Sequence, residues 1–273
     1  MERAIGLARL IHPAPAVAVV ALSAALALIV AAGAGVAPWD ARVLLTIASI
    51  AGSQVLTGAL NDWADRERDA TAQPDKPIAA GIVTPATALR LAGAGAALQI
   101  GASLPLGWLP LGIGAAASAS AVAYNLALSR TPWSVLPYLV SFGLLPAWIA
   151  AGVGVPLARV AGAMLLVGPF AAAAHLANAL RDFEADAASG SRNLAQVLGR
   201  RRAHALSAAM ALAVGIGVAV AFGAAGRMEP VSAALGSLGL AAVAVGATGS
   251  RRLWVAMLVA AVAWTAAWGL ATA

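Results

Sequence analysis

The sequence predicts an all-α polytopic membrane protein, with nine transmembrane helices in a bundle around a central cavity and a cap of loops on one membrane side. Three observations predict this class: 62% of the 273 residues are hydrophobic, only 10% are charged, and the mean hydropathy is +0.88. Soluble domains carry about 25% charged residues. The absence of cysteine excludes disulfide frameworks, thiolate metal sites and cysteine nucleophiles.

Each helix is placed in an interval between charged residues, because about 20 apolar residues span a bilayer. The first interval is long for a signal-peptide core and lacks a clear cleavage site, so it is interpreted as a span. Pro105, Gly107 and Pro110 divide one long interval into two helices. Thr84 and Pro85 mark a helix start as N-cap and first helical residue. In one domain, 1–273, we expect helices at 15–36, 42–60, 86–104, 109–128, 132–151, 157–180, 203–224, 230–248 and 253–271, with cap loops at 61–85 and 181–202.

The basic residues predict the orientation of the bundle through the excess of Lys and Arg on the cytoplasmic side. If the chain crosses the membrane nine times, fourteen of the 17 basic residues lie on one side of it. Only three lie on the opposite side: Arg42, Arg159 and Arg227. We therefore expect the N-terminus and both cap loops in the cytoplasm, in the plasma membrane. The net charge of +6 follows from this bias and does not indicate nucleic-acid binding. The other fourteen are Arg3, Arg9, Arg66, Arg68, Lys76, Arg90, Arg130, Arg181, Arg192, Arg200, Arg201, Arg202, Arg251 and Arg252.

Seven of the eleven acidic residues fall in two short windows, 61–69 and 178–186, and an eighth, Asp75, follows the first; these windows are the candidate functional motifs. In the first window, Asn61, Asp65 and Asp69 are spaced i, i+4, i+8 and share a helix face. Asp62 lies seven residues before Asp69 and joins that face. Like charges at this spacing repel, so cations are expected between them.

The second window repeats the first at a constant offset of 117 residues, with Asn178, Asp182 and Asp186 at the same spacing. This offset predicts an internal duplication in parallel orientation, which places two equivalent acidic helix ends on one membrane face.

The windows contain oxygen ligands but no His or Cys, and this ligand set suits Mg²⁺. Mg²⁺ keeps several bound waters, and substrate phosphates complete its coordination shell. Two alternatives stay open: solvated loop charges at the membrane boundary, and a cation pathway of a transporter.

Lys76, the only lysine, is a mobile charge suited to phosphate. Arg192 is its counterpart in the second loop, and Arg130 with Tyr124 approaches the same face. His12 is interpreted as an interfacial residue, and His175 as a packing residue.

These motifs resemble those of the UbiA-type intramembrane prenyltransferases. The similarity rests on the two windows, on the residues that follow each of them, 76–81 and 190–199, and on the segments 9–13 and 124–130. The resemblance covers nearly the whole chain. One departure is that Arg130 follows Ser129, where relatives often have a Lys-Arg pair.

The resemblance implies a prenyl diphosphate donor bound with Mg²⁺ at the cytoplasmic end of the cavity. It implies catalytic roles for Asp65, Asp182 and Lys76. It assigns metal binding to Asn61, Asp62, Asp65, Asp69, Asp182 and Asp186. Diphosphate contacts fall to Asn61, Lys76, Tyr124, Arg130, Asn178 and Arg192.

The expected reaction ionises the donor and transfers the carbocation to a small aromatic acceptor, as in quinone biosynthesis. The sequence leaves a sugar-phosphate or lipid-headgroup acceptor, or terpene cyclisation, as alternatives in the same fold. A cation-coupled transporter is the alternative from another class. No protein partner is predicted.

Overall fold

The structure, a computed structural model, describes residues 2–224, 226 and 229–272, which are helical apart from turns and contain no strand. Arg227, one of the three basic residues assigned to the opposite side, lies outside these residues. The helices are α1 (Glu2–Leu10), α2 (Pro13–Ala32), α3 (Ala41–Ala72), α4 (Pro85–Ser103), α5 (Trp108–Ala123), α6 (Leu136–Val153), α7 (Ala161–Ala179), α8 (Phe183–Ala188), α9 (Leu194–Leu198), α10 (Arg200–Ala224), α11 (Pro230–Gly246) and α12 (Ser250–Thr272). Short 3-10 turns are η1 (Leu104–Leu106) and η3 (Leu157–Val160), and η2 (Tyr124–Leu128) is a π-helix.

The nine expected spans correspond in order to α2, α3, α4, α5, α6, α7, α10, α11 and α12. Among the described residues, seven helical segments are long and apolar enough to cross a membrane. The two exceptions are α4, which includes Arg90 and Gln99, and α11, which has 17 residues. The polytopic all-α class is confirmed, whereas a count of nine spanning helices is not.

Of the two expected helix ends near the acidic windows, the one at residue 60 is wrong, and the one at residue 180 agrees with the structure to within one residue. The predicted loop 61–85 is helical as far as Ala72, because α3 continues through the whole first window. An ion pair within the helix and a lysine from the following loop neutralise its carboxylates, as described below. The second window, in contrast, interrupts its helix: α7 ends at Ala179 and α8 begins at Phe183.

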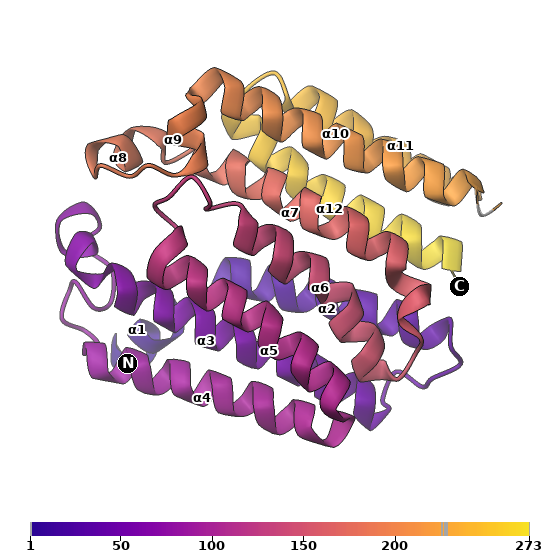
Figure 1. Ribbon diagram of the computed structural model, residues 1–273, viewed down its shortest axis with the longest axis horizontal. Coiled ribbons are helices and arrows are strands. Elements are labelled where there is room, and N and C mark those ends of the chain that lie inside the picture. Colours follow the sequence, from indigo (N-terminus) through magenta and orange to yellow (C-terminus); the bar gives the residue numbers. More distant parts are fainter. Residues whose placement is uncertain (1, 225, 227–228, 273) are drawn as a thin grey trace.

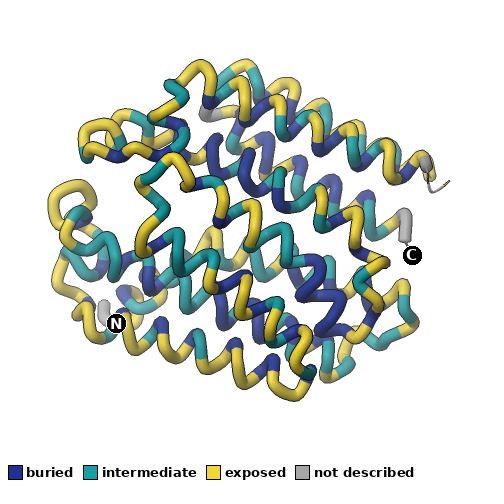
Figure 2. Tube along the Cα trace, viewed as in Figure 1, coloured by how far each residue is buried: buried dark blue, intermediate teal, exposed yellow. Residues whose placement is uncertain are grey.

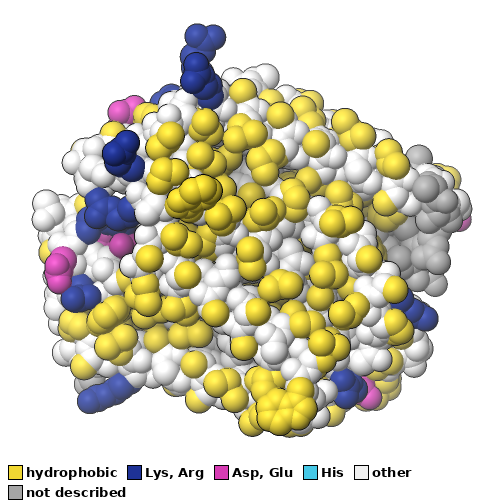
Figure 3. Space-filling model, in the orientation of Figure 1, with side chains coloured by type: hydrophobic (Ala, Val, Ile, Leu, Met, Phe, Trp, Pro, Cys, Tyr) yellow, Lys and Arg dark blue, Asp and Glu magenta, His cyan; other side chains and the backbone are white. Residues whose placement is uncertain are grey.

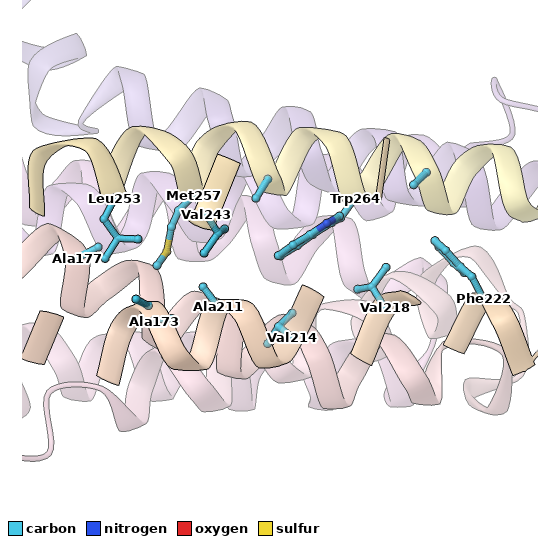
Figure 4. Close-up of a cluster of buried hydrophobic side chains, with 13 residues drawn as sticks. Ala173, Ala177, Ala211, Val214, Val218, Phe222, Val243, Leu253, Met257 and Trp264 are labelled. Carbon is cyan, nitrogen blue, oxygen red and sulfur yellow. The ribbon is translucent and has the colours of Figure 1, made fainter. Parts of the chain in front are cut away.

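The long helices pack side by side in a bundle with both motif loops at one end (Figure 1). Helix α3 packs extensively on α4, α7 packs between α6 and α10, and α12 contacts both α2 and α7. A cluster of buried apolar side chains, including Val243, Met257 and Trp264, joins α7, α10, α11 and α12 (Figure 4). Figure 2 shows that many exposed positions lie along the outer faces of these helices.

Close backbone approach fixes α3 beside its neighbours. A Cβ atom on Gly52 would lie 2.6 Å from the backbone nitrogen of Gln99 on α4, and one on Gly58 would lie 2.9 Å from the Cα of Ile11. Small residues allow this spacing, as is typical of helices packed in membranes. The helix that carries the first window is therefore held closely on two sides.

Charged side chains gather at the ends of the bundle, and the face between them is largely hydrophobic (Figure 3). At the end opposite the motif loops, Arg42 donates to the carbonyls of Leu106 (3.4 Å) and Ala151 (3.2 Å). Arg159 donates to the carbonyl of Gly33 at 2.8 Å. These two arginines thus bind carbonyls at helix ends, where positive charge is favourable.

Candidate functional site

The first window forms a compact ionic cluster at the end of α3. Asp62 and Asp69 are only 2% and 1% exposed, and the loop after α3 places the ammonium of Lys76 between them. Lys76 Nζ lies 3.0 Å from Asp62 Oδ1 and 2.8 Å from Asp69 Oδ2. Burial disfavours the ammonium, but the hydrogen bond to Asp69 and the charge of Asp62 outweigh it and raise the pKa of Lys76.

Two further side chains contact this cluster. His12, in the connection between α1 and α2, places its Nε2 3.0 Å from Asp62 Oδ1. His12 has φ +50°, in the left-handed region that non-glycine residues rarely adopt. The sequence predicts an interfacial residue here, and the structure adds a contact between its ring and a buried carboxylate. Arg68 Nη2 lies 2.7 Å from Asp65 Oδ2 one turn away on α3.

The π-helix η2 links the first window to α5. Its buried Asn125 accepts a hydrogen bond from Asn61 Nδ2 at 3.2 Å and donates to the carbonyl of Thr57 at 2.8 Å. Both partners lie on α3. The amide of Asn61 is thereby fixed beside the carboxylates.

The second window is more open. Asp182 and Asn178 are exposed, and Asn178 accepts only a long hydrogen bond, 3.4 Å, from Arg181. Asp186 is half-buried and accepts a hydrogen bond from Asn193 Nδ2 at 2.7 Å. Burial raises the pKa of the Asp186 carboxyl, helped by the nearby charge of Asp182 and opposed by the Asn193 bond.

Arg130 connects the segment after η2 to the loop after the second window. Its guanidinium donates to the carbonyl of Ser189, and its own carbonyl accepts from the backbone N–H of Arg192 at 3.0 Å. A hollow of about 690 Å³ is lined by both arginines and Gly190. A smaller hollow of about 340 Å³ is lined by Asp65, Arg68, Asn125 and Arg130, among others.

The two windows act on one another through charge. The positive charges of Arg68 on α3 and of Arg130 both act on the carboxyl of Asp186. Residues of the first window, of the second window and of the segment between them are thus brought to the same end of the bundle, as the repeated spacing predicts.

The first window fits a divalent cation only in part. Asp62 Oδ1 and Asp69 Oδ1 are buried without a hydrogen bond of good geometry, and carboxylate and amide oxygens suit Mg²⁺. However, no group of three or more His, Cys, Asp or Glu side chains in the described ranges is gathered closely enough to hold a metal ion. The residues therefore fit a divalent cation whose coordination shell is completed by water and a substrate phosphate.

An aromatic layer lies on the bilayer side of this cluster. His175 of α7 stacks on Tyr138 with ring centroids 4.2 Å apart and meets Tyr124 edge to face at 5.6 Å. Tyr138 also stacks on Phe142 of α6 at 6.1 Å. Tyr124 thus belongs to an aromatic cluster with Tyr138 and His175. Its diphosphate contact stays a prediction.

Comparisons with known proteins agree with the geometry. A model of the UbiA prenyltransferase family matches residues 20–270. A digeranylgeranylglyceryl phosphate synthase of Natronomonas pharaonis is 31% identical over 208 residues, which cover 74% of this chain and 72% of the relative. The chain belongs to the UbiA prenyltransferase family.

Solved structures of UbiA homologues share the fold of this prenyltransferase. The apo homologue from Aeropyrum pernix K1 has a TM-score of 0.73 at 20% identity, covering 91% of this chain and 96% of the homologue. The Archaeoglobus fulgidus homologue bound to GPP and Mg²⁺ has a TM-score of 0.72 at 17% identity, covering 98% and 99%. This UbiA-family chain is an integral membrane enzyme.

Three residues of the site were not among the sequence-predicted ligands: His12, Arg68 and Asn125. Each had a weak signal in the sequence. His12 precedes Pro13 in the N-terminal segment that resembles the family, Arg68 is interleaved with the acids, and Asn125 follows Tyr124. Only the packing of α1 and η2 against α3 reveals which carboxylate or amide each one contacts.

Proposed function

We propose that this prenyltransferase transfers the prenyl group of a prenyl diphosphate to a hydroxyl of a phosphorylated glycerol, forming an ether lipid. The main support for this proposal is the position of the charged groups. One end of the bundle contains both acidic windows and the basic residues Lys76, Arg130 and Arg192. Acidic groups suit a divalent cation, and basic groups suit phosphates. The hollow between Arg130 and Arg192 has room for a second phosphate, that of the acceptor.

The relatives support this acceptor over the aromatic one expected from the sequence. The Natronomonas pharaonis relative is named for a glyceryl phosphate product. A solved digeranylgeranylglyceryl phosphate synthase also has a TM-score of 0.74 at 14% identity, covering 98% of this chain and 99% of its own. The homologue bound to GPP and Mg²⁺ supports the donor and the cation.

In the proposed site, the metal is held by the acidic windows and stabilises the negative charge of the leaving diphosphate. Asp65 and Asp182 hold it from the two sides, together with Asp62, Asp69, Asp186 and the amide of Asn61. Asn178 supports the second window. The side chains of Lys76, Arg130 and Arg192 bind the diphosphate oxygens, with the Tyr124 hydroxyl at the rim.

The allylic carbon–oxygen bond then breaks, and its electron pair stays on the diphosphate. The acceptor oxygen forms the new bond to carbon and gives up its proton to an oxygen of the departing diphosphate. Lys76 stabilises the leaving group as a point charge close to the bond that breaks. The aromatic layer of Tyr138, Phe142 and His175 excludes water that would otherwise capture the carbocation.

We further propose that the motif end faces the cytoplasm of a plasma membrane, where water-soluble diphosphates are available. The excess of basic residues at this end supports the orientation.

The test is product analysis. Protein reconstituted in lipid is incubated with Mg²⁺, a series of prenyl diphosphates, and a panel of phosphorylated-glycerol, sugar-phosphate and aromatic acceptors. We expect a prenylated glycerol phosphate by mass spectrometry. Prenylation of the aromatic acceptors alone, or a cyclic hydrocarbon released without acceptor, would refute the proposed acceptor.

A further inference from the structure

Lys76 lies where a cation would bind to the first window. Its ammonium is within 3.0 Å of two carboxylates, Asp62 and Asp69, that are almost completely buried. Two carboxylates so placed are stable only when a positive charge lies between them. In the structure this charge comes from the chain itself.

One oxygen of each carboxylate is buried without a hydrogen bond of good geometry. Asp69 Oδ1 is buried, has no hydrogen bond, and has only Arg68 Nε near it, at 3.9 Å. Asp62 Oδ1 is shared between Lys76 and His12 without a well-formed hydrogen bond. Lys76 therefore neutralises the acidic pocket only in part, and the carboxylate oxygens are not saturated, as expected of a site that accepts a further ligand.

We propose that Lys76 is an internal counter-ion that keeps the first window closed to a divalent cation until a diphosphate draws its ammonium away. This inference rests on the proposed function. While Lys76 lies between the carboxylates, an incoming cation meets a positive charge a few ångströms away, which repels it. A diphosphate offers the ammonium new oxygen partners and frees Asp62 and Asp69 for the metal.

The backbone around Lys76 is suited to a movement of the side chain alone. The carbonyl of Asp75 accepts a hydrogen bond from Arg9 at 2.8 Å, and the N–H of Lys76 donates to the carbonyl of Gln73 at 3.0 Å. The carbonyl of Lys76 accepts from Ala80 at 2.8 Å. The loop is thus anchored on both sides of the residue, while the four-carbon side chain can rotate.

The second window has no such counter-ion. In the described residues, neither Asp182 nor Asp186 forms an ion pair, although Glu184 between them binds Arg200 at 2.7 Å. A divalent cation therefore meets no side-chain cation in contact with these carboxylates, and only the more distant charges of Arg68 and Arg130 act on Asp186. The two windows should accept metal in a fixed order, the second before the first.

The experiment measures binding of Mn²⁺, a spectroscopic substitute for Mg²⁺, by electron paramagnetic resonance on the full chain in detergent. The parent carries Asp182→Asn and Asp186→Asn, so that only the first window binds. We expect weak binding of Mn²⁺ alone, and binding on the order of tenfold tighter after Lys76→Gln because the competing charge is gone. Equilibrium dialysis with inorganic diphosphate should raise the protein-bound Mn²⁺ of the parent and raise that of Lys76→Gln less.

Two variants control this experiment. Lys76→Arg keeps the positive charge and should bind Mn²⁺ as weakly as the parent. Arg90→Gln removes one positive charge from an exposed position on α4 and should also leave binding unchanged. Thermal unfolding in the same detergent checks that each variant is folded.

Equal Mn²⁺ affinity of the parent and of folded Lys76→Gln would overturn the inference, as would equally tight binding with and without diphosphate. None of these measurements uses a prenyl chain or an acceptor. If the Lys76 effect is found but prenyl transfer is not, the proposed function fails and the counter-ion role stands. If prenyl transfer is found but Lys76→Gln does not change Mn²⁺ binding, the counter-ion role fails and the proposed function stands.

Discussion

The two acidic windows have the same spacing of amide and carboxylates but different structures. In the first, α3 continues unbroken, and Asp62 and Asp69 are buried against Lys76 and His12. In the second, the helix stops after Ala179, and Asp182 lies exposed before α8. The shared spacing thus gives a closed cluster on one side of the site, where Asp62 adds a carboxylate at the position that Ala179 has in the second window, and an open one on the other.

The difference shows that a helix with carboxylates aligned on one face continues or breaks according to the side chains that pack against those carboxylates. The imidazole of His12, the ammonium of Lys76 and the guanidinium of Arg68 contact carboxylates of the first window, and the helix continues. Around the second window, Asp186 is bound by the neutral amide of Asn193, and the chain turns at Leu180–Asp182 instead. Aspartate and asparagine are weak helix formers, so without cations a turn is favoured.

The largest expected effect tests whether both windows act in catalysis. We expect Asp65→Asn and Asp182→Asn each to lower prenyl transfer roughly 10³-fold, because each removes a charge that helps to stabilise the leaving diphosphate. Transfer from a radiolabelled prenyl diphosphate measures this. Asp75→Asn is the matched control, since the Asp75 side chain is 83% exposed and binds only Arg9 at 3.4 Å. Full activity of folded Asp182→Asn would leave the open window without a catalytic role.

The next effect concerns stability and separates the closed window from the open one. Lys76→Met removes the ammonium that lies between two buried carboxylates and should cost about 3 kcal/mol, measured by unfolding in detergent. Arg192→Met, beside the second window, should cost less than about 1 kcal/mol because Arg192 is exposed. Adding Asp69→Asn to Lys76→Met should recover part of the loss. Similar losses for Lys76→Met and Arg192→Met would contradict the contrast between the windows.

The smallest expected effect is on the local stability of the loop that follows the second window. Asn193 caps α9 through the backbone N–H of Gln196 at 3.0 Å and also binds Asp186. Asn193→Ala should cost about 1 kcal/mol, since it removes a helix cap. Hydrogen exchange should show faster exchange over residues 183–199 and no change over 61–76. Gln73→Ala, in the other loop on an exposed side chain, is the control. Unchanged exchange over 183–199 would mean that the open window does not depend on this cap.

The fold was largely predictable because long charge-free intervals determine where helices can lie. The same holds for the placement of both windows at one end, which follows from the parity of the helices between them. The extent of α3 was not predictable, because Lys76 and His12 reach its carboxylates from other segments. Spacing also could not show that Asn178 and Asp182 lie on a broken helix. The metal and diphosphate ligands remain predictions.

The five-residue π-helix at Tyr124–Leu128 has a consequence for how insertions and deletions would act. A π-helix holds more residues per turn than an α-helix, so every residue after it is rotated relative to a regular α5. In this register Asn125 faces α3 and Arg130 reaches the carbonyl of Ser189. Deleting one residue from this segment would restore a regular helix and turn Arg130 about 100° away. The length of this segment therefore matters more than most of its side chains.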